Sequence, residues 1–140
     1  VPGIDGQIMS KSYDNTIPIF DPEKATRKRI MSIVTDSTPV EDPKDPDKCS
    51  VFQLYSLFAT DEQRAEMAER YRAGGMGYGD AKKELFEAFM AQFGEARKRR
   101  EELAADPGYV REVLRKGAEH ARAVARVTLD RCRAACGVDI

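Results

Sequence analysis

The chain has 140 residues, enough for one domain with a hydrophobic core, and a formal net charge of −1 does not indicate a nucleic-acid-binding protein. RNA contacts would therefore have to come from local basic patches. No apolar run is long enough to span a membrane, and three cysteines are too few for a disulfide scaffold, which indicates a cytoplasmic protein. The sequence has no initiator Met and no signal peptide, so we interpret it as a piece of a longer protein.

Glycines and turn-forming polar residues predict a loop-rich segment over residues 1–20. Asp21 and Pro22 then predict a helix start, with the aspartate as N-cap and the proline at the first helical position. This helix should run to about Val34. Prolines among acidic residues predict a loop over residues 35–49.

Two further helices are predicted in the middle of the chain. Ser50 should cap a buried, mostly apolar helix that reaches Phe58. Thr60 and Gln63 have the spacing of a capping box, which predicts the start of a helix that ends at about Arg72.

The C-terminal part is predicted to be helical throughout. After a glycine-rich break, Asp80 should cap a long helix to about Ala105, with core residues at spacings of three and four. Another helix is predicted over residues 107–116, and Gly117 should separate it from a last helix to about Cys136. The sequence therefore predicts an all-α fold preceded by a loop-rich N-terminal segment.

One motif in the first segment carries chemistry. The residues Ile8-Met9-Ser10-Lys11-Ser12 resemble the Lys-Met-Ser-Lys-Ser signature of the class I aminoacyl-tRNA synthetases, with Ile8 in place of the first lysine. Further segments, in the same order along almost the whole chain, resemble the tryptophanyl branch of that family: 9–17, 21–24, 27–31, 34–37, 77–83, 106–109, 116–119 and 121–122. The tyrosyl branch is the nearest relative and is less similar.

The resemblance implies the C-terminal half of a tryptophan–tRNA ligase. Residues 1–20 would end the catalytic nucleotide-binding domain and carry the ATP loop, and residues 21–140 would form the C-terminal helical domain that binds the tRNA anticodon. Such enzymes use ATP and Mg²⁺ to activate tryptophan, transfer it to tRNA-Trp, and form homodimers through the half that is missing here. The tryptophan pocket and the His-Ile-Gly-His-type signature are absent, so the chain alone should be inactive.

The resemblance assigns Lys11 a catalytic role. When the carboxylate of tryptophan attacks ATP, negative charge grows on the α-phosphoryl and leaving oxygens, and a lysine on a loop that closes over the nucleotide can neutralise it. Ser10 and Ser12 can donate to phosphate oxygens, and Met9 should pack inward to anchor the loop. Ile8 completes the predicted ATP-binding set, although its contact with phosphate should be weaker than that of lysine.

Five residues are candidates for tRNA contacts. Lys82 and Lys83 are adjacent lysines near a predicted helix start, which suits phosphate and base contacts. Asp36 could accept from the amino group of a cytosine. Arg97 and Arg100 belong to a basic run later in the same helix. Each lysine or arginine could equally lie on a solvated helix face, and Asp36 could be an ordinary turn residue.

One alternative to the ligase remains open, and a metal site is not predicted. A synthetase-like helical module that binds RNA or protein without catalysis is favoured by Ile8. Cys132 and Cys136 lie one helical turn apart, but no zinc-type pair spacing is present with Cys49 or His120, so no metal site is predicted.

Overall fold

The regular secondary structure is helical throughout the described part of the chain. The computed structural model describes residues 1–138, in which Pro2 and Ile8 form an isolated antiparallel β-bridge and no longer strand occurs. The predicted all-α fold class is therefore confirmed. By spatial contacts the chain divides into two compact units, one from Val1 to Arg97 and one from Lys98 onward. The boundary predicted between residues 20 and 21 lies inside the first unit and stays a prediction.

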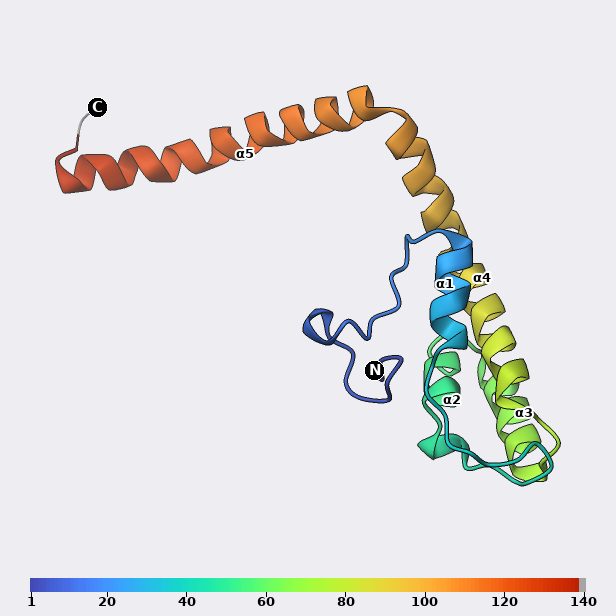
Figure 1. Ribbon diagram of the computed structural model, residues 1–140. Helices are drawn as coiled ribbons and strands as arrows, with labels where there is room; N and C mark the ends of the chain where they lie inside the picture. The colour runs from blue at the N-terminus through green and yellow to red at the C-terminus, as the bar shows by residue number, and fades with distance from the viewer. Residues whose placement is uncertain (139–140) are drawn as a thin grey trace. The chain divides into compact units, whose positions relative to one another are not determined.

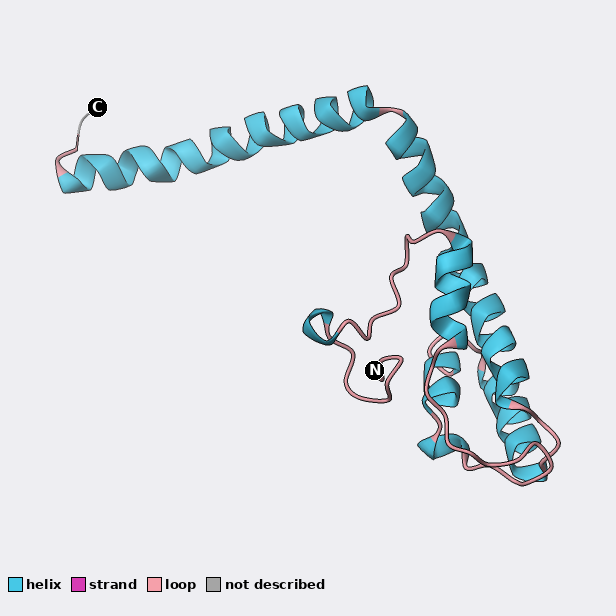
Figure 2. Cartoon of the chain, in the orientation of Figure 1, coloured by secondary structure: helices cyan, strands magenta, loops and turns pink. Residues whose placement is uncertain are grey.

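The first unit is built from α1 (Glu23–Met31), α2 (Ser50–Tyr55), α3 (Asp61–Ala73) and the first part of α4 (Tyr78–Ala105), as Figure 1 shows. Two short 3₁₀ turns, η1 (Lys11–Tyr13) and η2 (Pro46–Lys48), interrupt its loops. Most of residues 1–22 run as loop before α1 begins (Figure 2).

These helices share one apolar core. Its most buried members include Ile30 from α1, Val51 from α2, Met67 and Tyr71 from α3, and Leu85 from α4, each at most 1% exposed. Burial of such side chains is the main favourable contribution to folding. The core therefore fixes the four helices of the first unit against one another.

The ends of α1 differ from the prediction. Pro22 occupies the N-cap position that was predicted for Asp21. The helix ends at Met31 instead of Val34, because the N–H of Val34 donates to the carbonyl of Ile4 at 2.7 Å. A backbone contact with the N-terminal segment thus replaces the last predicted helical turn.

The capping box at the start of α3 is confirmed. The Thr60 hydroxyl accepts from the N–H of Gln63 at 3.3 Å, and the Gln63 side chain accepts from the N–H of Thr60 at 2.9 Å. In α2, by contrast, Ser50 is the first helical residue and not the cap, and the helix ends at Tyr55, before Phe58. The intervening residues form the turn that leads to Thr60.

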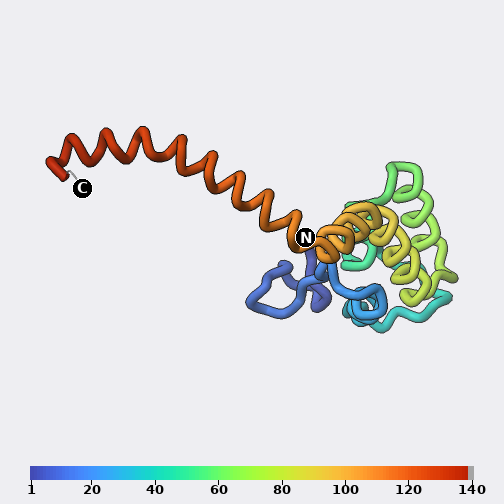
Figure 3. Tube along the Cα trace, turned by 90° about the horizontal axis from the view of Figure 1, so that it is seen from above, coloured from blue at the N-terminus to red at the C-terminus, as the bar shows by residue number. Residues whose placement is uncertain are grey.

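The last two helices also begin or continue differently from the prediction. α4 begins at Tyr78, so Asp80 lies in its first turn and does not cap it. In the second unit, α5 (Pro107–Cys136) is capped by Asp106 and runs unbroken through Gly117 (Figure 3). The predicted break is wrong because a glycine inside a helix costs only about 1 kcal/mol relative to alanine.

Among residues 1–138, no helix combines the length and the apolar character that a membrane span requires.

Candidate functional site

The motif residues form a short, ordered turn at the surface. The Ser10 hydroxyl accepts from the N–H of Ser12 at 3.3 Å and caps η1, whose first residue is Lys11. The side chain of Lys11 is exposed, and its ammonium has no hydrogen bond or ion pair with another residue in the described range. The turn therefore presents a cation to solvent, which suits contact with an anionic ligand.

The two apolar residues of the motif lie differently. Met9 is partly buried and packs against the core of the first unit, so the prediction that it packs inward is confirmed. Ile8 is 80% exposed. Its carbonyl faces inward and accepts from the side chain of Asn15 at 3.1 Å.

Asn15 is the polar centre of this loop. It is 1% exposed, and its Oδ1 accepts from the N–H of Ser10 at 2.7 Å. Its Nδ2 donates to Asp5 at 2.9 Å as well as to Ile8. The hydrogen bond from Asn15 lowers the pKa of the exposed Asp5 carboxyl. One buried amide thus connects Asp5, which precedes the motif, with Ile8 and Ser10 inside it.

Arg29 connects the far end of the loop to α1. Its Nε donates to the carbonyl of Thr16 at 2.5 Å, and its guanidinium also donates to the carboxylate of Asp14 at 2.6 Å and to the carbonyl of the same residue. Asp14 ends η1 with a φ of 48°, in the left-handed region. The planar fork of arginine suits several acceptors at once.

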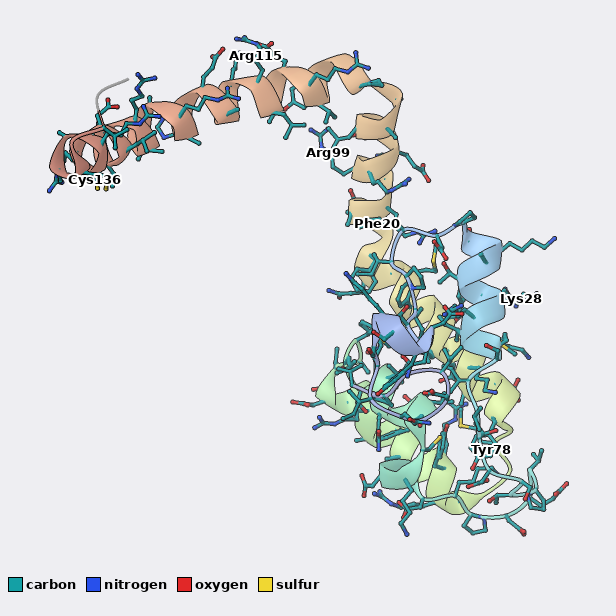
Figure 4. The ribbon with its side chains drawn as sticks, turned by 60° about the vertical axis from the view of Figure 1, so that its left-hand side comes forward. Phe20, Lys28, Tyr78, Arg99, Arg115 and Cys136 are labelled. Atoms are coloured by element: carbon teal, nitrogen blue, oxygen red, sulfur yellow. The ribbon has the colours of Figure 1, made fainter. Side chains whose placement is uncertain are left out.

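A second cluster lies where α4 begins, beside the segment that follows α1. The hydroxyl of Tyr78, labelled in Figure 4, donates to the carboxylate of Asp36 at 2.7 Å. Thr38 donates its N–H to the same carboxylate at 2.9 Å. Hydrogen bonds from Thr38 and then from Tyr78 lower the pKa of Asp36, and burial together with Asp36 raises the pKa of Tyr78 to about 12.

The two predicted lysines follow Tyr78 on α4, about one helical turn later. Lys82 is half-buried and donates to the carbonyl of Met31 at 3.2 Å, and burial lowers the pKa of its ammonium. Lys83 is exposed and pairs with Asp80 at 2.9 Å. The segment that follows α1 is thus attached to the start of α4 at two points, Asp36 to Tyr78 and Met31 to Lys82.

The two predicted arginines lie farther along α4. Arg97 is half-buried, and its guanidinium donates to the carbonyls of Ile19 and, at 2.6 Å, of Asp21. The guanidinium N–H groups of Arg97 bind the backbone just before α1, so they are not available for a contact with tRNA. Arg100 is exposed and belongs to the second unit. The guanidinium of Arg97 is therefore used within the first unit, and a role of either arginine toward tRNA stays a prediction.

The three cysteines are free thiols in the described part of the chain. Cys49 is buried and lies 3.5 Å from the hydroxyl of Tyr71, whereas Cys132 and Cys136 are exposed on α5. Burial, followed by the contact with Cys49, raises the pKa of Tyr71. Within residues 1–138, no group of three or more His, Cys, Asp or Glu side chains could hold a metal ion.

Sequence reasoning missed three residues that shape these two sites. Asn15, Arg29 and Tyr78 all act through contacts with residues at a distance in sequence or on another element. Asn15 is the only asparagine in the sequence, and this was the one feature of the sequence that could have drawn attention to it.

The comparisons with a family model and with known proteins match this chain to the same family of enzymes. A family model described as tRNA synthetases class I (W and Y) matches residues 1–94. The chain is 54% identical over 138 residues to a tryptophan–tRNA ligase of Rhodopirellula baltica, covering 99% of this chain and 43% of that protein. It is 47% identical over 125 residues to a tryptophan–tRNA ligase of Fusobacterium nucleatum, covering 89% of this chain and 38% of that protein.

A solved structure is similar in fold as well. In the crystal structure of tryptophanyl-tRNA synthetase from Campylobacter jejuni complexed with ADP and tryptophan, the match has a TM-score of 0.95 and a sequence identity of 44%. It covers 98% of this chain and 43% of that one. The chain therefore spans less than half the length of these relatives.

Proposed function

This chain belongs to the class I tRNA synthetases of the tryptophan and tyrosine branch, and from that premise we propose that it is the C-terminal part of a tryptophan–tRNA ligase. The remainder of that enzyme would supply the tryptophan pocket. The observation that carries the proposal is the exposed ammonium of Lys11 on a capped turn, inside a chain that is similar to tryptophan–tRNA ligases over 99% of its length.

The first step of the reaction is the activation of tryptophan. Its carboxylate attacks the α-phosphorus of ATP, a new O–P bond forms, and pyrophosphate leaves with the electrons of the broken bond. Lys11 is suited to donate to the phosphate oxygens on which negative charge grows, with Ser10 and Ser12 as further donors. Met9 keeps the turn against the core, and Ile8 offers no charge to the nucleotide. The Mg²⁺ ion that accompanies ATP would be held mainly by the phosphates.

The second step transfers the aminoacyl group to tRNA-Trp, and we assign anticodon contact to the cluster at the start of α4. The carboxylate of Asp36 is kept ionised by its hydrogen bonds, which suits it to accept from a cytosine amino group. Lys82 and Lys83 follow Tyr78 on α4, and we assign them contacts with phosphate. Arg97 would act only indirectly, because two backbone carbonyls occupy its guanidinium, and Arg100, in the second unit, would contact the tRNA separately.

The full-length enzyme would be cytoplasmic and would form a homodimer through the half outside this chain.

The test of the function separates the two half-reactions. With Lys82 and Lys83 both changed to alanine in the full-length enzyme, we expect tRNA aminoacylation to fall while tryptophan-dependent ATP–pyrophosphate exchange stays intact. Unchanged kinetics toward tRNA would end the assignment of the anticodon surface.

One observation favours a second candidate. Ile8 stands where the family signature has a lysine and is 80% exposed, so the loop carries one cation fewer than the signature. A helical module that binds RNA or protein without catalysis would tolerate this change. Absence of tryptophan-dependent pyrophosphate exchange in the full-length parent, together with retained RNA binding, would favour the module over the ligase.

A further inference from the structure

We propose that Asn15 and Arg29, which lie outside the five-residue signature, are positioning residues that hold the ATP loop in the shape that presents Lys11. The proposal rests on the function proposed above and deepens it, because it concerns the same nucleotide site. Neither side chain needs to touch ATP.

Asn15 fixes the loop on the N-terminal side of Lys11. Its side-chain amide uses Oδ1 for the N–H of Ser10 and Nδ2 for Ile8 and Asp5. The carbonyl of Asn15 also accepts from the N–H of Ile4 at 2.9 Å. A fully buried amide whose donors and acceptor are all engaged defines one backbone conformation, because any other would leave a buried polar group unpaired.

Gly3 makes the space that this amide occupies. A Cβ atom added at position 3 would lie 2.5 Å from both Cγ and Nδ2 of Asn15. Atoms at that separation clash, so the first residues of the chain are shaped around the asparagine side chain. Gly3→Ala therefore disturbs Asn15 without removing any of its hydrogen-bonding groups.

Arg29 fixes the loop on the C-terminal side of Lys11. The side chain belongs to α1, and its own backbone is held by the core through the neighbouring Ile30. Its contacts with Asp14 and Thr16 lock the residue that ends η1 and the backbone beyond it. Lys11 thus lies between two tethered points, at Ser10 and at Asp14.

This arrangement has a consequence for the nucleotide. A loop that is already shaped loses less conformational entropy when ATP binds, and its lysine is presented in the correct direction. Loss of the contacts of Asn15 or of Arg29 should leave Lys11 present and positively charged. It should reduce the fraction of time that the ammonium of Lys11 spends near the phosphates. The effect should therefore appear in the kinetics toward ATP and not in those toward tryptophan.

The decisive experiment uses the full-length enzyme in tryptophan-dependent ATP–pyrophosphate exchange. For Arg29→Met we expect kcat/KM for ATP to fall between about tenfold and a hundredfold, while KM for tryptophan is unchanged. Arg29→Lys should recover only part of the loss, because lysine cannot contact Asp14 and Thr16 with a rigid fork. The matched control is Lys28→Met, which removes the adjacent exposed cation of α1, whose side chain makes no hydrogen bond or ion pair with the loop in the described part of the chain.

Asn15→Ala and Gly3→Ala test the other tether. Both should lower kcat/KM for ATP with KM for tryptophan unchanged, and Gly3→Ala should do so although Asn15 is still present. Should Asn15→Ala unfold the protein, Arg29→Met and Gly3→Ala still decide. An Arg29→Met enzyme with the kinetics of the wild type, or one whose KM values for ATP and tryptophan rise together with a loss of thermal stability, would overturn the proposal. Failure of the proposed function itself would look different, since the wild-type enzyme would then show no exchange.

Discussion

The two compact units of the chain are stabilised by different means. Residues 1–97 enclose a core to which all their helices contribute, and several of its large side chains are at most 1% exposed. In α5, by contrast, none of the described residues is buried, and Leu114 and Val124 are 67% and 63% exposed. Local signals define α5: Asp106 caps its start, and Gly137 closes its end in the left-handed conformation.

This difference shows how the candidate sites obtain their geometry. In the first unit, tertiary packing fixes the backbone, so side chains distant in sequence, such as Arg29 and Asp14, can be held within hydrogen-bond distance. In the second unit, ion pairs such as Arg115–Glu119 join residues one turn apart on the same helix. Exposed pairs of this kind contribute little to stability. Substitutions should therefore have large effects in the first unit and small effects in the second.

The largest expected effect comes from the core. Leu85→Ala removes a side chain that is 1% exposed and should lower the free energy of unfolding by about 2–5 kcal/mol. Leu114→Ala makes the same chemical change at a position that is 67% exposed, and should leave that free energy nearly unchanged. Urea unfolding followed by circular dichroism measures both. An equal decrease in the free energy of unfolding for the two variants would contradict the proposed difference between the units.

Helix caps should give an intermediate effect that also differs between the units. Thr60→Ala removes half of the capping box of α3 and should cost about 1 kcal/mol in the main unfolding transition. Asp106→Ala removes the cap of α5, and we expect it to reduce ellipticity at 222 nm without moving the midpoint of that transition. A shift of the midpoint by Asp106→Ala would show that α5 is part of the same cooperative unit.

The smallest effect concerns a titration that only a packed unit can produce. Burial, followed by the hydrogen bond to Asp36, raises the pKa of Tyr78 from 10.0 to about 12. Because the pKa is raised in the folded state, this stabilisation is complete below pH 10 and is lost as the pH rises from about 10 to about 12. Thermal unfolding across this pH range should show a decline that Tyr78→Phe reduces. An identical decline in the Tyr78→Phe variant would contradict the assignment.

Local sequence signals predicted much of the fold and part of the site. Three predicted features agree with the structure: the capping box at Thr60, the end of α4 at Ala105 and the packing of Met9 against the core. The first two depend on neighbours in sequence or on apolar spacing, and the third on the resemblance of the motif. The sequence did not reveal where α1 ends, because the backbone of Val34 pairs with Ile4 instead of continuing the helix. Such a competition between a helical and a long-range hydrogen bond is decided by tertiary structure.

The candidate sites show the same limit. Lys11 was assigned from its motif, and Asp36, Lys82 and Lys83 from their residue types and the resemblance; these assignments stay predictions. That Asp36 meets Tyr78, and that Arg97 is occupied by the carbonyls of Ile19 and Asp21, follows only from the folded chain. No spacing in the sequence connects those partners.

The most direct test of the proposed function is Lys11→Ala in the full-length enzyme, measured by tryptophan-dependent ATP–pyrophosphate exchange. Lys28→Ala is the matched control, because Lys28 is an exposed lysine on the outer face of α1 (Figure 4). We predict that Lys11→Ala lowers the exchange rate about a hundredfold or more, with tryptophan binding unchanged and Lys28→Ala without effect. An exchange rate for Lys11→Ala equal to that of the wild type would contradict the assignment of this loop to the chemistry of ATP.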